Sequence, residues 1–393
     1  MKRHCLLILS RTFWPFAALS PVRLYRVAPL VLALLAFGQF PSAAQQPTRG
    51  SGKLYIVDSN AADTTSSALV VDLEKGQVTK TYPAGFHPDI ALSADGRRLY
   101  LAYDAVNFER TEEKGVLDVI DTATGDLIAR VDNPNRWLAI GKLYDSTMAI
   151  SKDGRWLFVY KMSKDGAFYG LAVFDTTTNR FLPDTISLPM CEAALLSPSQ
   201  RFGNTLFVVC KGTNDVRTAR LTPNGKPVVN ELPSGFRFVR DGMVENAFQS
   251  EDELLRVVMR DGAYSTLDVA TRSIVGRGTL AGTPAKPGTE AEAKRLVRVS
   301  QSYADEVFLG LARHGHGYLF DEIAIVNADT LERTATMQAS APLWAFAFGG
   351  GGSRLYGLDP RGGNIHVFDT TRAVETEIIK GVGKSPTIAI LSP

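Results

Sequence analysis

Histidines are the residues of this chain best suited to metal or acid–base chemistry, and they are few. Four of the five lie beyond residue 44, and His314 and His316 share the motif RHGHG. A metal site needs three or four converging ligands, and the glycines of this motif predict a loop between two apolar stretches. His366 alternates with Ile365 and Val367, which predicts a packed or edge residue on a strand. The histidines therefore do not indicate a metal centre.

Two cysteines, Cys191 and Cys210, lie beyond residue 44. The turn SPSQRFGN between them centres between Gln200 and Arg201, so paired positions of an antiparallel hairpin sum to 401, as 191 and 210 do. The spacing predicts a disulfide between adjacent strands in an oxidising compartment. On the chain-entropy model this link contributes about 3 kcal/mol to stability. Two reduced core cysteines are the alternative, and a redox centre is not indicated without a third thiol.

The sequence does not contain the complete motif of a phosphate loop, a nucleophile elbow or a calcium site. The run GGGG at 349–352 lacks the Gly-Lys-Ser/Thr ending of a phosphate loop and precedes a strand, so it predicts a hairpin turn. No serine lies in a nucleophile elbow, and no spaced pair of carboxylates occurs. Asp58 could face a central tunnel, but one carboxylate does not make a calcium site. We expect no catalytic residue, cofactor or metal on this chain.

The N-terminal segment predicts export. Residues 1–44 contain five basic residues and no acidic one, with the apolar run VAPLVLALLAFGQF and the small residues of PSAAQQ. This pattern is typical of a secretory signal peptide cleaved after Ala44; an uncleaved anchor is the alternative. Without it, 38 basic residues face 41 acidic ones, a formal charge of −3 that does not favour nucleic-acid binding. We expect residues 45–393 to be a soluble periplasmic domain, off the membrane after cleavage.

These residues lie within a repeat. An apolar strand followed by a polar turn recurs seven times at spacings of 42 to 59 residues. The residue between them is Asp at five places, Asn at one and Leu at one: Asp72, Asp121, Asp175, Leu221, Asp268, Asn327 and Asp369. Asp or Asn at such a turn bonds its side chain to backbone amides ahead of it. Hairpin phrases such as ALSADGRRLYLAYD lie between these marks, and two hairpins per unit give a four-stranded sheet. This period predicts an all-β fold, a seven-bladed β-propeller of four-stranded antiparallel sheets.

The two ends of the repeat are each half of a hairpin. SGKLYIVDS (Ser51–Ser59) lacks the strand before it, and TIAILSP (Thr387–Pro393) lacks the strand after it. We expect these strands to pair in one blade and close the ring, which removes two exposed edges; two frayed tails are the alternative. In LYLAY (Leu99–Tyr103) both faces are apolar, as expected for a sheet covered on both sides.

The chain resembles the heavy, propeller subunit of quinoprotein amine dehydrogenases, the methylamine and aromatic amine enzymes. The resemblance is carried by Gly85, Phe86 and Pro88, by the stretches 109–111, 119–121 and 136–141, and by LPMCEAALLSPS, LFDEIAIVNADTLERTATM and GKSPTIAI. Cys191 and Cys210 match a disulfide of that family, and Phe86 matches a phenylalanine at its substrate channel; a core aromatic is the alternative for Phe86.

The resemblance implies a non-catalytic subunit. In that family a separate small light chain carries the tryptophan tryptophylquinone cofactor and the catalytic base, and the complex passes electrons to a periplasmic copper protein or cytochrome c. We therefore expect a heavy-chain-like scaffold of an amine-oxidising complex, with a stand-alone binding or scaffold propeller as the main alternative and a tunnel-metal hydrolase as a third.

The chain departs from this family in two places where partner contacts are expected. Few residues separate Ala44 from Leu54, where the family has an acidic helical arm. Residues 281–295 lack the family's Trp- and Gly-rich run, and we expect them to form either a solvated loop or a partner contact.

Overall fold

The computed structural model describes most of the chain beyond residue 51. The described residues are 52–59, 66–106, 113–133, 148–162, 169–191, 194–198, 205–210, 213, 215–222, 226–231, 244–249, 254–259, 262–268, 271, 273–280, 294–301, 306–313, 319–327, 329–349 and 352–392. They lie in one compact unit, Pro47–Pro393. Within these ranges there is no helix of the length and apolar character needed to cross a membrane.

The described residues form seven antiparallel sheets, named here sheets 1 to 7 and given from the inside of the ring outward. Sheet 1 contains β29 (Pro386–Leu391), β1 (Lys53–Asp58), β2 (Ser66–Asp72) and β3 (Gln77–Ala84). Sheet 2 contains β4 (Phe86–Leu92), β5 (Arg98–Val106), β6 (Glu113–Asp121) and β7 (Leu127–Asn133). Sheet 3 contains β8 (Met148–Ile150), β9 (Trp156–Met162), β10 (Tyr169–Asp175), β11 (Arg180–Phe181) and β12 (Ile186–Ser187).

Sheets 4 to 7 follow the same order along the chain. Sheet 4 contains β13 (Ala194–Pro198), β14 (Thr205–Cys210), β15 (Asp215–Leu221) and β16 (Pro227–Glu231). Sheet 5 contains β17 (Val244–Gln249), β18 (Leu254–Met259), β19 (Ala263–Asp268) and β20 (Ser273–Thr279). Sheet 6 contains β21 (Lys294–Gln301), β22 (Glu306–Arg313), β23 (Phe320–Asn327) and β24 (Arg333–Leu343). Sheet 7 contains β25 (Ala345–Gly349), β26 (Arg354–Asp359), β27 (Asn364–Asp369) and β28 (Val374–Ile379).

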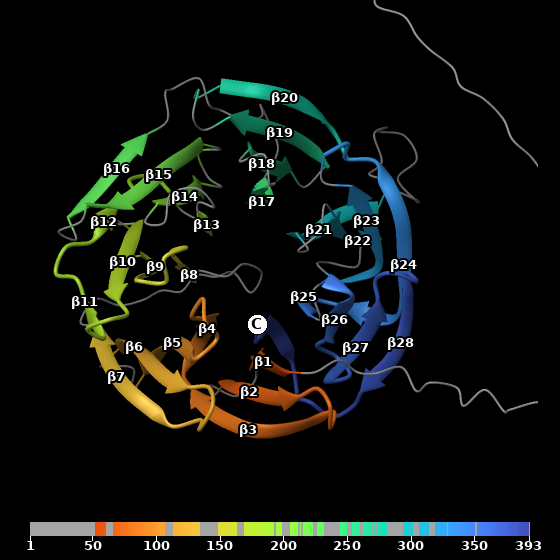
Figure 1. The fold of residues 1–393 in the computed structure, drawn as a ribbon, viewed down its shortest axis with the longest axis horizontal. Helices are drawn as coiled ribbons and strands as arrows, with labels where there is room; N and C mark the ends of the chain where they lie inside the picture. Colours follow the sequence, from red (N-terminus) through yellow and green to blue (C-terminus); the bar gives the residue numbers. More distant parts are fainter. Residues whose placement is uncertain are drawn as a thin grey trace, which may run out of the picture. The chain divides into compact units, whose positions relative to one another are not determined.

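The sheets are arranged radially about a central axis, with β4, β8, β13, β17, β21 and β25 nearest to it (Figure 1). The predicted all-β propeller is confirmed. Six of the sheets have four strands, but in sheet 3 both β11 and β12 pair with β10 in place of one outer strand. Pro183 lies between these two short strands. Because proline has no backbone N–H to donate, it interrupts the ladder at that point.

The strands nearest the two ends of the chain share sheet 1, as predicted. β29 pairs antiparallel with β1, with Leu391 opposite Leu54 and Ile390 opposite Tyr55. Ile388 and Ile390 pack into the core between sheets 1 and 2, while Ala389 and Leu391 pack into the core between sheets 7 and 1. Because alternate side chains of a strand point to opposite faces, β29 seals both neighbouring interfaces, and Figure 1 marks the C-terminus near the axis.

Asp58 takes part in this closure. Its carboxylate accepts hydrogen bonds from the backbone N–H of Lys384, at 3.0 Å from both oxygens, and of Ser385, at 2.6 Å. A Cβ on Gly383 would lie 2.8 Å from the Asp58 Cγ, so only glycine allows this close approach. These bonds tie the segment that leads into β29 to the end of β1. The Asp58 carboxylate, considered above for a calcium site in a central tunnel, therefore binds backbone N–H groups.

The repeated Asp and Asn residues form the predicted turns. Side-chain oxygens accept backbone N–H bonds two or three residues ahead at Asp72, Asp121, Asp175, Asp268, Asn327 and Asp369. Three of these turns share a further contact: the hydroxyls of Thr122, Thr176 and Thr370 donate to the carbonyls of Gly96, Gly154 and Gly352 at 2.7, 2.8 and 2.7 Å. Each joins the two turns at one end of a sheet.

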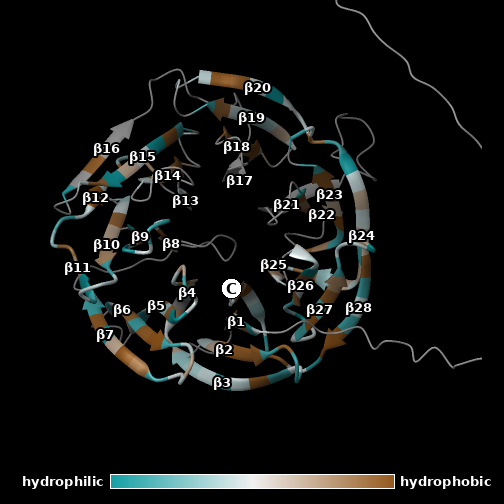
Figure 2. Ribbon diagram, viewed as in Figure 1, coloured by the Kyte–Doolittle hydropathy of each residue, from teal (hydrophilic) through white to brown (hydrophobic). Residues whose placement is uncertain are grey.

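The core lies between neighbouring sheets. Leu99, Leu101 and Tyr103 of β5 pack toward sheet 1, whereas Tyr100 and Ala102 pack toward sheet 3. Both faces of this strand are therefore covered, as its two apolar faces predicted. Figure 2 shows hydrophobic residues on strands all round the ring.

The ring has two different ends, which follow from the strand order. Each outer strand finishes, and each next inner strand begins, at one end, named here the crossover end; the Asp-containing turns lie at the other. The strands separated by the long stretches 134–147 (β7 and β8) and 232–243 (β16 and β17) finish and begin at the crossover end. Connecting segments of this length are where binding residues are most often placed.

Candidate functional site

Phe86, the predicted channel residue, lies at the crossover end as the first residue of β4. It is half-buried, and its Cα pairs with that of Asp104. A Cβ on the preceding residue, Gly85, would lie 2.0 Å from the Asp104 carbonyl oxygen. Glycine is therefore required for the chain to enter β4 at this place, and this fixes where Phe86 stands. The structure gives the position of Phe86, and its part in a channel stays a prediction.

Buried charges lie at the same end of the interface between sheets 2 and 3. Asp89, Asp104 and Lys161 are 3, 5 and 6% exposed. Asp104 continues the face of β5 on which Ala102 packs toward sheet 3, and Lys161 continues the face of β9 on which Val159 packs toward sheet 2. Burial lowers the pKa of the Lys161 ammonium. Two acids and one base thus lie at the crossover end of an interface whose central residues are apolar.

The disulfide fastens another crossover. Cys191 and Cys210 are bonded, with their Cα atoms 5.0 Å apart. The predicted register is wrong, however, because Cys210 of β14 pairs with Ala194 and paired positions sum to 404. The hairpin therefore centres on Phe202 rather than before Arg201. Cys191 lies ahead of β13, so the bond joins the connection between sheets 3 and 4 to the second strand of sheet 4.

Several contacts hold this connection rigidly. The Tyr160 hydroxyl donates to the Cys191 carbonyl, and the buried Arg217 guanidinium donates to the Pro189 carbonyl at 2.7 Å. Between them Met190 has a φ of 60° and is 73% exposed. A non-glycine residue in the left-handed region is costly unless its surroundings impose it. The crossover end therefore presents one large apolar side chain on a fixed backbone.

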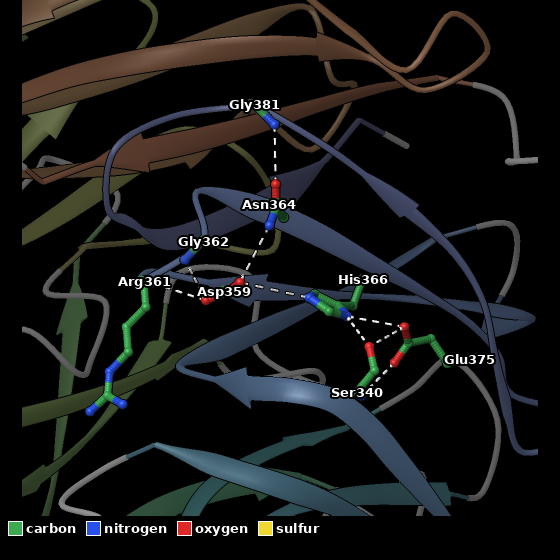
Figure 3. A network of polar contacts seen from close by, with 8 residues as sticks. All are labelled: Ser340, Asp359, Arg361, Gly362, Asn364, His366, Glu375 and Gly381. Carbon is green, nitrogen blue, oxygen red and sulfur yellow. Dashed lines mark hydrogen bonds and ion pairs between the residues drawn. The ribbon is translucent and has the colours of Figure 1, made fainter.

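His366 is the centre of a polar network between sheets 6 and 7 (Figure 3). It is 1% exposed, and its Nδ1 lies 3.2 Å from Glu375 Oε1 while its Nε2 lies 3.9 Å from Asp359 Oδ2. Ser340 donates to Glu375 through its backbone N–H at 2.8 Å and through its hydroxyl at 2.7 Å. Asp359 Oδ1 also accepts the backbone N–H of Gly362 at 2.9 Å. The prediction of a packed histidine is confirmed, but its acidic partners were not foreseen.

The types Ser, His and Asp in this network resemble a hydrolytic triad only in composition. A triad serine donates its hydroxyl to the histidine base. Here the Ser340 hydroxyl donates to Glu375, and His366 Nδ1 lies 3.4 Å from the Ser340 oxygen. A buried imidazole also has no access to a substrate, so this network connects two sheets and does not form a nucleophile.

Metal ligands do not gather in the part of the chain that the structure describes. No group of three or more His, Cys, Asp or Glu in these ranges has the arrangement of a metal site. His314 and His316 of the RHGHG motif, residues 281–293 of the insertion, and Gly350 and Gly351 of GGGG lie outside the described residues.

Comparison with known proteins supports the resemblance to the amine dehydrogenase heavy chains. The family model of the methylamine dehydrogenase heavy chain matches residues 51–222. A curated methylamine dehydrogenase heavy chain from Methylophilus methylotrophus is 24% identical over 213 residues, 53% of this chain and 49% of that protein. The resemblance to this heavy-chain family is confirmed. The chain spans about half the length of this curated relative.

Solved structures share the fold. A functionally unknown protein from Desulfotomaculum acetoxidans DSM 771 has a TM-score of 0.63 at 12% identity, over 87% of this chain and 99% of that one. The β-propeller domain of Cps50 (Swd1) from Myceliophteria thermophila has a TM-score of 0.53 at 13% identity, over 77% of this chain and 89% of that one. At these identities the likeness concerns the propeller alone.

Sequence reasoning missed the buried charges. Asp104 and Lys161 each interrupt an apolar strand, in LYLAYD and FVYKM. A single charge within such a run is a signal that could have been used, because a buried charge needs compensating partners. Ser340, Asp359 and Glu375 carried no such signal, since their relation to His366 exists only after sheets 6 and 7 have packed.

Proposed function

We propose that this chain is a seven-bladed, heavy-chain-like periplasmic subunit that holds a small catalytic partner for amine oxidation. The observation that carries this proposal is the match of the heavy-chain family model to residues 51–222, the range that contains Phe86, the disulfide and the ring-closing β1. The partner would carry tryptophan tryptophylquinone and would pass electrons to a periplasmic copper protein or cytochrome c.

The chemistry of the described residues is consistent with this division of labour. Buried acids and bases lie within interfaces between sheets, and His366 is enclosed by Asp359 and Glu375. Reactive groups of an enzyme have to reach a substrate, which these groups do not. In this proposal the partner carries out the oxidation, and this chain supplies a rigid frame.

We place the partner at the crossover end. Phe86 and Met190 both lie there, and Met190 is the most exposed of the large hydrophobic residues that the structure describes. A large apolar side chain on a fixed backbone is suited to anchor a partner, because the backbone loses little freedom on binding. β20 finishes and β21 begins at the same end, and these strands flank the insertion in the sequence.

Co-purification tests the proposal. The full chain with an affinity tag would be expressed together with its neighbouring genes and isolated from the periplasm, and the intact mass of each small co-purifying protein would be measured. A partner with a tryptophylquinone modification and amine-dependent dye reduction is the expected result. A stable monomer with neither property would overturn the proposal and favour the stand-alone binding propeller.

Matched variants locate the contact. Met190→Lys is expected to weaken partner retention at least tenfold, because it places a charge in an apolar contact. Val275→Lys is the control, since Val275 is 55% exposed on the outer strand β20, near the turn end. Equal retention by both variants would place the partner elsewhere.

A further inference from the structure

The network around His366 is part of a longer line of contacts that crosses three sheets. From sheet 6, Ser340 contacts Glu375 of β28, Glu375 contacts His366 of β27, and His366 faces Asp359 at the end of β26. Asp359 Oδ1 shapes the following turn by accepting the backbone N–H groups of Arg361 and Gly362, both at 2.9 Å. Figure 3 shows His366 between the two carboxylates, with the Arg361 side chain directed away from it.

That turn holds the segment leading into the closing strand. The Gly363 carbonyl accepts the backbone N–H of Val382 at 2.8 Å, and Asn364 Oδ1 accepts that of Gly381 at 3.1 Å. Two residues later, Lys384 and Ser385 are bound by Asp58 of sheet 1. His366 therefore lies midway along a polar path from sheet 6 to the ring closure.

The two carboxylates place conflicting demands on a neutral imidazole. Neutral histidine has one N–H donor and one lone pair, whereas the imidazolium has two donors. With one proton, shared with the nearer Glu375 at Nδ1, the Nε2 lone pair faces the Asp359 carboxylate. Consistent with this, Nε2 has no hydrogen-bond partner among the described residues. Only the doubly protonated ring attracts both carboxylates, which offsets the cost of burying its charge.

The described residues packed in this interface from sheet 6 are mainly apolar. On the sheet 6 side, the residues packed in this interface include Phe308 of β22 and Ile323 and Ile325 of β23. Ser340 of β24 is the polar contact from that sheet, at 3.4 Å from Nδ1. Among the described residues, the charged groups within ion-pair distance of the imidazole are thus Asp359 and Glu375, both acidic.

We propose that Glu375, His366 and Asp359 form a proton-dependent latch on the ring closure. With His366 doubly protonated, the imidazole holds both carboxylates, and the turn at 361–364 keeps the segment 381–383 and β29 in place. With His366 neutral, the contact with Asp359 is lost, and β29 opens more often. Histidine is the side chain whose unperturbed pKa lies between pH 5 and 8. This inference does not depend on a bound partner.

Histidine NMR of the mature protein tests the first half of the proposal, because only four histidines remain beyond residue 44. The ring nitrogens would be observed between pH 5.5 and 8.5, with His366→Gln used to assign the signals. We expect His366 to change from doubly protonated to a neutral ring with its proton on Nδ1. One unchanged protonation state over the whole range would overturn the latch.

Amide hydrogen exchange tests the second half. Protection factors of residues 381–391, corrected for intrinsic exchange at each pH, are expected to fall about fivefold from pH 5.5 to 8.5, the effect of one net hydrogen bond of ordinary strength. In His366→Gln they should not change with pH. A fall of the same size in wild type and variant would refute the coupling.

A pair of turn variants controls for fold defects. Asp359→Asn removes the charge opposite Nε2 but keeps an oxygen for the N–H groups of Arg361 and Gly362. Asp121→Asn makes the same change at the turn of sheet 2, where Asp121 accepts from Ala123 and Thr124. The pH dependence in 381–391 should be lost in Asp359→Asn and kept in Asp121→Asn; the same behaviour in both would overturn the proposal.

Discussion

Asp58→Ala should loosen the ring at its closure. The Asp58 carboxylate binds the backbone N–H groups of Lys384 and Ser385 at 3.0 and 2.6 Å, and a hydrogen bond to a charged acceptor contributes about 1.5–3 kcal/mol. Both donors lie near solvent, so water replaces part of the loss, and we expect a cost of about 3 kcal/mol. With an unfolding entropy of roughly 0.7 kcal/mol/K for a domain of this size, the Tm falls by about 4 °C.

The assay separates local opening from general damage. Differential scanning calorimetry gives the Tm, and hydrogen exchange of β29 shows whether the loss is at the closure. Asp72→Ala is the control, because Asp72 contacts the nearby Glu74 and Lys75 within an exposed turn of the same sheet; its Tm shift should be less than half as large. If the two variants behave alike, or if β29 exchanges no faster in Asp58→Ala, then Asp58 does not hold the closing strand.

Three further predictions follow from other contacts. Replacing both Cys191 and Cys210 by serine removes a link that spans 19 residues and should cost about 3 kcal/mol, measured as a Tm about 4 °C lower than that of the oxidised wild type. Burial raises the pKa of Asp369, but hydrogen bonds from Arg372 and Arg354 outweigh it and lower this pKa to about 2. The associated stability is present above pH 4 and is lost between about pH 4 and 2, so acid titration of Asp369→Asn should show a shallower loss than wild type. Gly85→Ala places a Cβ 2.0 Å from a backbone oxygen; the strand entry then has to move, and we expect a lower soluble yield and a lower Tm, whereas Gly381→Ala, with open space at its Cβ but a φ of 68°, should be affected less.

The repeat could be predicted because its signals are local. An Asp that caps a turn, as Asp121 does, and a strand with two apolar faces, as in Leu99–Tyr103, are both set by residues a few positions apart. The ring closure was predictable for the same reason, since each end of the chain lacked a strand. The divided outer strand of sheet 3 was not predicted, although Pro183 is a local signal for it because proline cannot donate to the ladder.

The disulfide was predicted correctly, but the strand register used to predict it was wrong. The sum rule placed Cys191 opposite Cys210 on paired strands, but the turn centre is displaced and Cys191 lies before the strand begins. The bond forms because the crossover returns past β14, and this depends on how sheets 3 and 4 pack. Long-range packing decides the His366 network too, where residues from three strands of sheet 7 meet one of sheet 6.

Some polar contacts of this propeller join neighbouring sheets, and these bear on what the protein can do. Lys53 of sheet 1 donates to the Thr122 carbonyl of sheet 2 at 2.6 Å, and Arg98 of sheet 2 repeats the contact with Thr176 of sheet 3 at the same distance. Such links at the turn end oppose bending of one sheet against the next, so the crossover end is supported by a stiff ring. A partner that docks there loses little binding energy to ordering the frame. If the latch at His366 loosens one interface, partner retention should weaken at the pH where β29 opens, and this joint measurement would connect the two proposals.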